Sequence, residues 1–175
     1  MPERFDRFES GVRVIRALGS AVAATETGVT RPDRFHALDG ATSDPPPLTP
    51  GGPPIWLRGQ KRRGIALAAE VAQGWLLPAV TPDKSPTNMA YFADRRDAIL
   101  AALEAVGRDP ATFAFGAQVP AGATAASRRE ALAGAFAATR LGATHIVLGM
   151  PPRLGADGVD GVAHEVAEPL RAAVG

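Results

Sequence analysis

Cysteine is absent from this 175-residue chain, and it also lacks long hydrophobic runs and any excess of one charge. Without cysteine there is neither a disulfide framework nor a thiolate metal site, so we expect a reducing, cytoplasmic location. No apolar run approaches the roughly 18–20 residues that span a bilayer, so we expect no membrane segment. The N-terminal sequence MPERFDRFES lacks the apolar core of a secretory signal.

The charge balance argues against two classes of partner. With 19 basic and 18 acidic side chains the net charge is +1, so no overall field attracts nucleic acid or a membrane surface. The basic cluster KRR is short and has no interleaved aromatic residues to stack on bases. A hydrophobic fraction of 46% is instead typical of a globular protein that buries a core.

The first third of the chain predicts one helix and then an irregular segment. Apolar residues recur at spacings of three and four between about Glu3 and Leu18, at Phe5, Phe8, Val12 and Ile15, which predicts an amphipathic helix. Residues 19–53 contain TRPDR, SDPPPLTP and GGPP, and these prolines favour an irregular surface excursion. At this length we expect a single partial-barrel domain over residues 1–175.

The remainder alternates short apolar strands with helices. Strands are predicted at 55–57, 75–77, 113–119 and 145–150, and helices at 61–73, 88–106, 127–141 and 159–173. Three of the helices are followed by glycine, at Gly74, Gly107 and Gly142, where we expect a positive φ to close the last turn.

This order predicts an α/β fold with a parallel sheet, its strands adjacent in sequence order. Four βα units are half of a (β/α)₈ barrel, which typically takes about 250 residues. The pattern alone leaves open a small open sheet or one half of a TIM-type barrel.

The segment from Arg58 to Gly64, RGQKRRG, is the strongest candidate for chemistry. It lies between the end of a predicted strand and the start of a helix, where free backbone N–H groups and the helix dipole favour an anion. Its basic side chains oppose that dipole, and a bound phosphate would neutralise them. Ile65 and Ala66 exclude a Walker A loop. The alternative is a solvated basic helix start that binds nothing.

Other polar and aromatic residues give weaker signals. His145 begins the last strand, at the end of the sheet associated with stability, and three scattered histidines show no metal-ligand spacing. No Ser-His-Asp arrangement is evident, so the catalytic residues are unassigned. The following roles are expected from position: packing for Trp56 and Trp75, pocket lining for Gln118, Met150 and Arg153, an exposed ion pair for Asp83 and Lys84, and a solvated helix face for Arg95 and Arg96.

Several motifs, in this order and spacing, resemble the luciferase-like monooxygenase family, and more narrowly its members that use the deazaflavin coenzyme F420. The motifs are FDRFESGVRVIRAL, FHALDGATSDPPPLTPGGPPIWLRG, ALAAEVAQGWLLP, EAVGRDPATFAF, GATHIVLGM and VAEPLRA. The resemblance covers nearly the whole chain but only strands five to eight of the family's barrel, with the helix before them. Where the family has a Gly-Gly pair after the first of these strands, this chain has Arg58-Gly59.

The resemblance implies a flavin- or deazaflavin-dependent oxidoreductase that acts on an unknown small molecule. It implies coenzyme F420 as the cofactor, with FMN as the alternative, and a parallel (β/α) half-barrel corresponding to the C-terminal half of a TIM-type barrel. The residues expected to bind the cofactor phosphate are Arg58, Gly59, Gln60, Lys61 and Arg62. The alternative function is a non-catalytic or partner-completed module. Such a module would assemble through exposed strand edges, either as a homo-oligomer or with a separate N-terminal half-barrel.

Overall fold

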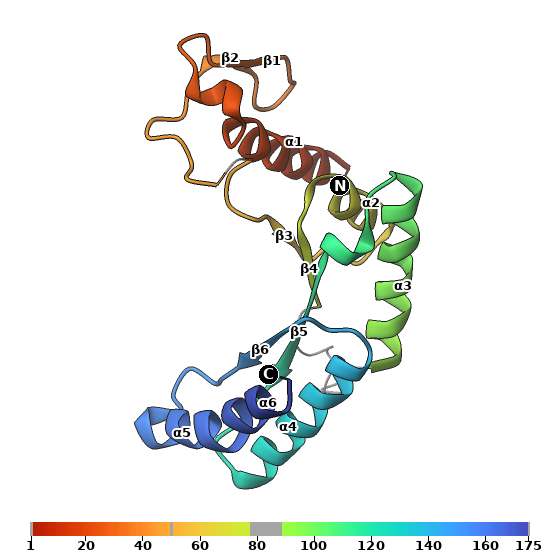
Figure 1. The fold of residues 1–175 in the computed structure, drawn as a ribbon, viewed down its shortest axis with the longest axis vertical. Helices are drawn as coiled ribbons and strands as arrows, with labels where there is room; N and C mark the ends of the chain where they lie inside the picture. The colour runs from red at the N-terminus through yellow and green to blue at the C-terminus, as the bar shows by residue number, and fades with distance from the viewer. Residues whose placement is uncertain (1, 50, 78–88, 175) are drawn as a thin grey trace. The chain divides into compact units, whose positions relative to one another are not determined.

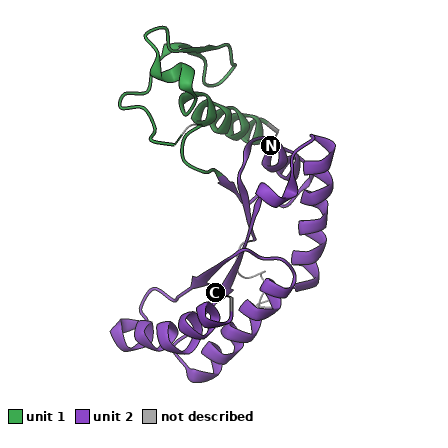
Figure 2. Ribbon diagram, viewed as in Figure 1, with its two compact units in different colours: residues 1–55 green, residues 56–175 purple. Residues whose placement is uncertain are grey.

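The structure is a computed structural model that describes residues 2–49, 51–77 and 89–174. The chain divides into two compact units, residues 1–55 and 56–175 (Figure 2). The first unit combines a helix with a small hairpin, and the second contains the parallel sheet. The grouping of residues 1–175 as one partial-barrel domain stays a prediction.

The first unit begins with the predicted helix, α1 (Pro2–Leu18). Val12 on its apolar face is buried, whereas Phe8 and Ile15 on the same face are 49% and 56% exposed. Periodicity therefore predicted the helix correctly, but only part of its apolar face is covered by this chain.

The predicted irregular excursion over residues 19–53 contains regular elements that the sequence did not reveal. A 3₁₀ turn, η1 (Ala21–Ala24), precedes an antiparallel pair of strands, β1 (Val29–Arg31) and β2 (Leu38–Ala41). These strands are too short to show an apolar alternation. Gly28 packs so closely that a Cβ there would lie 2.5 Å from the Gly40 carbonyl oxygen, and its φ is 61°.

The second unit contains one four-stranded sheet, in which all strands run parallel in the order β3-β4-β5-β6 (Figure 1). The strands are β3 (Trp56–Leu57), β4 (Gly74–Leu77), β5 (Ala114–Pro120) and β6 (His145–Gly149). The predicted α/β fold with parallel strands in sequence order is therefore confirmed.

Helices follow the strands as predicted, with two differences at the C-terminal end. Their bounds are α2 (Arg62–Val71), α3 (Met89–Ala105), α4 (Ala125–Arg140), α5 (Gly155–Val162) and α6 (Glu168–Val174), with a short 3₁₀ turn, η2 (Pro110–Thr112), before β5. The last helical segment begins four residues earlier than predicted. A π-helical turn over Ala163–Ala167, labelled η3, joins α5 to α6.

The two faces of the sheet differ in what covers them. One face packs against α2, α3, α4 and the C-terminal helical segment. Its central side chains Trp75, Phe115 and Val119 are at most 5% exposed, whereas Ile146 and Leu148 on the last strand are only partly buried. Figure 1 shows α3 and α4 running along this face. We call the opposite face the inner face. Within the described part of the second unit no helix lies over it, and it carries Trp56, Gly74, Leu76, Gly116, Gln118, His145 and Val147.

The three glycines predicted to end helices have two different roles. Gly107 and Gly142 have φ values of 69° and 88° and close their helices as predicted. The prediction for Gly74 was wrong, because this residue is the first of β4 and does not have a positive φ. A Cβ at Gly74 would lie 2.5 Å from the Trp56 ring, and one at Gly116 would lie 2.8 Å from it. Both glycines therefore make room for a tryptophan that lies across the inner face.

Replacing Gly74 with alanine tests this packing. The added methyl group would overlap the Trp56 ring, so we expect Gly74→Ala to destabilise the protein by about 1–3 kcal/mol in chemical denaturation. Gly134→Ala is the matched control, because it lies within α4 and its Cβ would be 3.4 Å from Val119. The control should gain roughly 0.5–1 kcal/mol. Equal effects of the two substitutions would contradict the packing described here.

Candidate functional site

The predicted cofactor-binding segment, residues 58–62, connects the end of β3 to the start of α2. Two glycines bring this connection close to the helix: a Cβ on Gly59 would lie 2.6 Å from the Gly64 Cα, and one on Gly64 would lie 2.7 Å from the Gly59 Cα. Any side chain at either position would push the segment away from the first turn of α2. The glycines therefore fix the path of the backbone at the helix start.

Side chains from neighbouring elements hold the backbone of this segment. The Trp75 indole Nε1 donates to the Gly59 carbonyl at 3.1 Å, and the Arg95 guanidinium donates to the Gln60 carbonyl at 3.2 Å. The Tyr91 hydroxyl donates to Gln60 Oε1 at 2.8 Å. The connection is thus attached to β4 and to α3 before any ligand binds.

Sequence reasoning missed the role of α3 in this site. Arg95 was expected on a solvated face, but its side chain is partly buried and bonds to the segment, so that expectation was wrong. Tyr91 and Arg95 are four residues apart and share one helix face, and the Arg95 guanidinium lies 5.6 Å from the Tyr91 ring. The spacing of four residues shows in the sequence that Tyr91 and Arg95 share a helix face, but the sequence does not show which segment that face contacts.

The start of α2 carries positive charge that no side chain caps. Lys61 occupies the N-cap position in an extended conformation and makes no side-chain cap bond, and no acidic residue lies in the first turn. Lys61 and Arg62 are both exposed. Since the first backbone N–H groups of a helix have no partner within it, donors and cations gather here, an arrangement that suits an anion.

Arg58 does not join this group of cations. Its guanidinium donates to Gln118 Oε1 on β5 at 3.2 Å, so its side chain crosses β4 on the inner face. Gln118, predicted to line a pocket, is therefore brought to the predicted segment. Met150 and Arg153 are exposed residues that follow β6. Asp83 and Lys84 lie outside the described residues.

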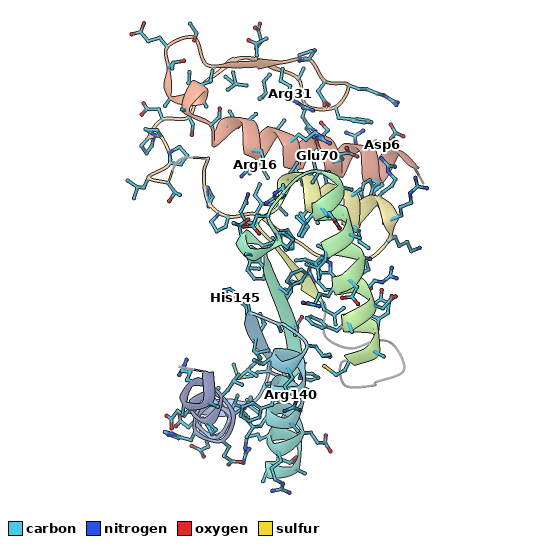
Figure 3. The ribbon with its side chains drawn as sticks, turned by 45° about the vertical axis from the view of Figure 1, so that its right-hand side comes forward. Asp6, Arg16, Arg31, Glu70, Arg140 and His145 are labelled. Atoms are coloured by element: carbon cyan, nitrogen blue, oxygen red, sulfur yellow. The ribbon has the colours of Figure 1, made fainter. Side chains whose placement is uncertain are left out.

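The two tryptophans and His145 have packing roles, as predicted. Trp75 is fully buried, and its ring centre lies 6.0 Å from that of Phe92. Trp56 meets the His145 ring edge-on at 4.9 Å. His145 lies at the beginning of β6 (Figure 3). The 58–62 connection follows β3 and therefore lies at the opposite, carboxyl end of the parallel sheet.

In the first unit the structure brings together a serine, an aspartate and a histidine that the sequence did not connect. The buried Ser10 hydroxyl donates to Asp33 at 2.5 Å and lies 3.0 Å from His36 Nδ1. The hydroxyl of Ser10 and the backbone N–H groups of Phe35 and His36 hold the pKa of Asp33 well below its ordinary value. In a catalytic triad the histidine lies between the other two residues, whereas here the serine does. The cluster attaches residues 31–36 to α1.

The described ranges contain neither a cluster of metal-ligating side chains nor a membrane-spanning helix. Those residues contain no group of three or more histidine, aspartate or glutamate side chains that could hold a metal ion. The same residues form no helix with the length and apolar character needed to cross a bilayer.

The sequence as a whole matches the luciferase-like monooxygenase family over residues 1–172, and the chain belongs to that family. Among curated proteins, none matches this chain. Solved structures do match. An F420-dependent secondary alcohol dehydrogenase in complex with an F420–acetone adduct has a TM-score of 0.74 at 15% identity, over 98% of this chain and 63% of that one.

Two other solved structures share the fold. The F420-dependent tetrahydromethanopterin reductase of Methanopyrus kandleri has a TM-score of 0.64 at 11% identity, over 93% of this chain and 62% of that one. Riboflavin lyase with modified FMN and riboflavin has a TM-score of 0.62 at 11% identity, over 97% of this chain and 57% of that one. The chain thus spans 57–63% of the length of these three solved proteins.

Tyr91→Phe tests how the segment is held. The substitution removes the hydroxyl bond to Gln60 but keeps the ring beside Arg95, so we expect a loss of about 0.5–1.5 kcal/mol in the free energy of unfolding. Amide hydrogen exchange at Gln60 and Lys61 should accelerate more than exchange in β5. Unchanged exchange at these two amides would show that α3 does not hold the segment.

Proposed function

We propose that this chain is the cofactor-phosphate-binding part of an F420- or FMN-dependent oxidoreductase, and that residues 58–62 form the binding segment. The observation that carries the proposal is the uncapped, basic start of α2, which follows a glycine at the end of a parallel strand. Family membership supports it, as do three solved structures whose descriptions name F420 or FMN.

The residues present fit a phosphate. Phosphate oxygens only accept hydrogen bonds, and the first turn of α2 offers backbone N–H groups, the Lys61 ammonium and the Arg62 guanidinium. No carboxylate in that turn would repel the ligand. A bound dianion would also relieve the unfavourable placement of two cations at the positive end of the helix.

The cofactor, when bound, supplies the hydride chemistry, and the protein binds and orients it. The attachment of Gly59 and Gln60 to Trp75, Tyr91 and Arg95 fixes the segment before binding. A preformed segment loses little conformational freedom on binding, so more of the interaction energy appears as affinity. Phosphate binding here would also place one end of the cofactor at a defined position relative to the sheet.

We also propose that further βα units pair with the two edge strands of this sheet. In the described part of the chain, β3 and β6 each pair on one side only, which leaves two open edges. A pocket of about 540 Å³ lies beside β6, lined by Ile146, Leu148 and Leu170 among others. An N-terminal half-barrel, or a second copy of the chain, would cover these apolar groups and complete the walls around cofactor and substrate.

Comparing FMN with riboflavin tests the phosphate site, because the two ligands differ only in the phosphate group. By isothermal titration, FMN should bind more tightly than riboflavin to the intact chain. Lys61→Ala and Arg62→Ala should each weaken FMN binding about two- to fivefold, the range expected for exposed ion pairs, and leave riboflavin unchanged. Coenzyme F420 should respond to the substitutions as FMN does.

Arg140→Ala is the matched control, since Arg140 is an exposed cation at the far end of another helix, α4 (Figure 3). It should leave the affinity of every ligand unchanged. Equal affinities for FMN and riboflavin in the intact chain would contradict the proposed phosphate site.

A further inference from the structure

The inner face of the sheet contains a second cationic group, which the phosphate site does not use. Arg58 follows β3 directly, and its bond to Gln118 shows that its side chain projects on the same face of the sheet as Trp56. Gly74 of β4 and Gly116 of β5 leave room for the Trp56 ring. The Arg58 side chain lies next to this ring, nearer the carboxyl ends of the strands. The phosphate-binding helix start and the Arg58 guanidinium are therefore two separate anion-attracting groups.

Gln118 holds the Arg58 side chain in place but does not neutralise the positive charge of its guanidinium. Gln118 Oε1 accepts one N–H of the guanidinium at 3.2 Å, and an amide oxygen carries no net charge. Gly149 of β6 leaves room for the Gln118 amide, because a Cβ there would lie 3.2 Å from Gln118 Nε2. In the described part of the chain no ion pair joins Arg58 to a carboxylate.

Among the described strand residues, the remainder of the inner face also has no acidic side chain. Its residues on β4, β5 and β6 have no carboxylate; they are Gly74, Leu76, Ala114, Gly116, Gln118, Pro120, His145, Val147 and Gly149. A guanidinium offers several N–H donors in a planar fork that matches a carboxylate, and only one of them is used by Gln118. Trp56, next to Arg58 on the same face, offers a flat aromatic surface.

We propose that Arg58 and Gln118 form a recognition pair for a carboxylate, or a similar anionic oxygen group, on a planar ligand that lies over Trp56. Within the proposed function, on which this inference rests, such a group would belong to the substrate or to the non-phosphate part of the cofactor. Arg58 then determines specificity on the inner face, while Lys61 and Arg62 bind the phosphate.

Benzoate and benzamide are suitable probes, since they have the same shape and differ in charge. We would titrate each into the full ¹⁵N-labelled chain and follow the two tryptophan indole signals and the Gln118 side-chain amide. Benzoate should shift the Trp56 indole and the Gln118 amide and leave the buried Trp75 indole unchanged. It should also bind about fivefold more tightly than benzamide, the ratio expected for an ion pair at a solvent-accessible site.

Arg58→Gln removes the charge, and Arg62→Gln, four residues further along the same segment, is the matched control. Arg58→Gln should abolish the preference for benzoate, and Arg62→Gln should preserve it while weakening FMN. The inference is overturned if benzoate does not bind, if it shifts other signals, or if the preference survives Arg58→Gln. The FMN and riboflavin titrations are independent of these outcomes, so failure of the phosphate site would be recognised separately.

The source of the anionic group is distinguished by adding FMN first. If benzoate still shifts the Trp56 indole at saturating FMN, the recognition pair is available to a substrate. If FMN blocks benzoate, and Arg58→Gln weakens riboflavin as much as FMN, the pair binds the ring part of the cofactor. Either result supports recognition at Arg58, provided that the preference for benzoate depends on that residue.

Discussion

The Trp56 ring lies flat across the inner face, and the rest of the proposed binding surface depends on that packing. The ring fits only because the two neighbouring strands have glycine where its atoms pass, at Gly74 and Gly116. It ends against the edge of His145 on the last strand, so one side chain spans the width of the sheet. With this layer filled, Arg58, the first residue after β3, is directed across the sheet to Gln118.

The same sheet holds the proposed phosphate-binding segment from its other face. Trp75, which follows Gly74 in β4, points to the helices, and its indole N–H bonds to the Gly59 carbonyl. Two consecutive residues of β4 therefore support the two parts of the proposed site. Gly74 leaves room for the Trp56 ring on the inner face, and Trp75 holds the 58–62 segment on the other face. A shift of register by one residue would exchange these roles and lose both.

Periodicity and glycine spacing predicted the parallel sheet, its strand order and the loop at residues 58–62, because those features depend on neighbours along the chain. The role of Gly74 could not be predicted, since the reason for it is a ring 18 positions earlier in the sequence. The Tyr91 and Arg95 bonds to Gln60 and the Arg58 bond to Gln118 join residues 31 to 60 positions apart. The hairpin of residues 29–41 was missed because its strands are only three and four residues long.

The central claim is that a cofactor phosphate binds the first turn of α2, and backbone amide resonances report on that turn directly. Addition of FMN to the ¹⁵N-labelled chain should produce its largest shifts at the amides of Arg62, Arg63 and Gly64, because these N–H groups begin the helix. Riboflavin, which lacks the phosphate, should leave these three amides nearly unchanged. Shifts of the same size with both ligands, or shifts confined to other parts of the chain, would contradict the claim.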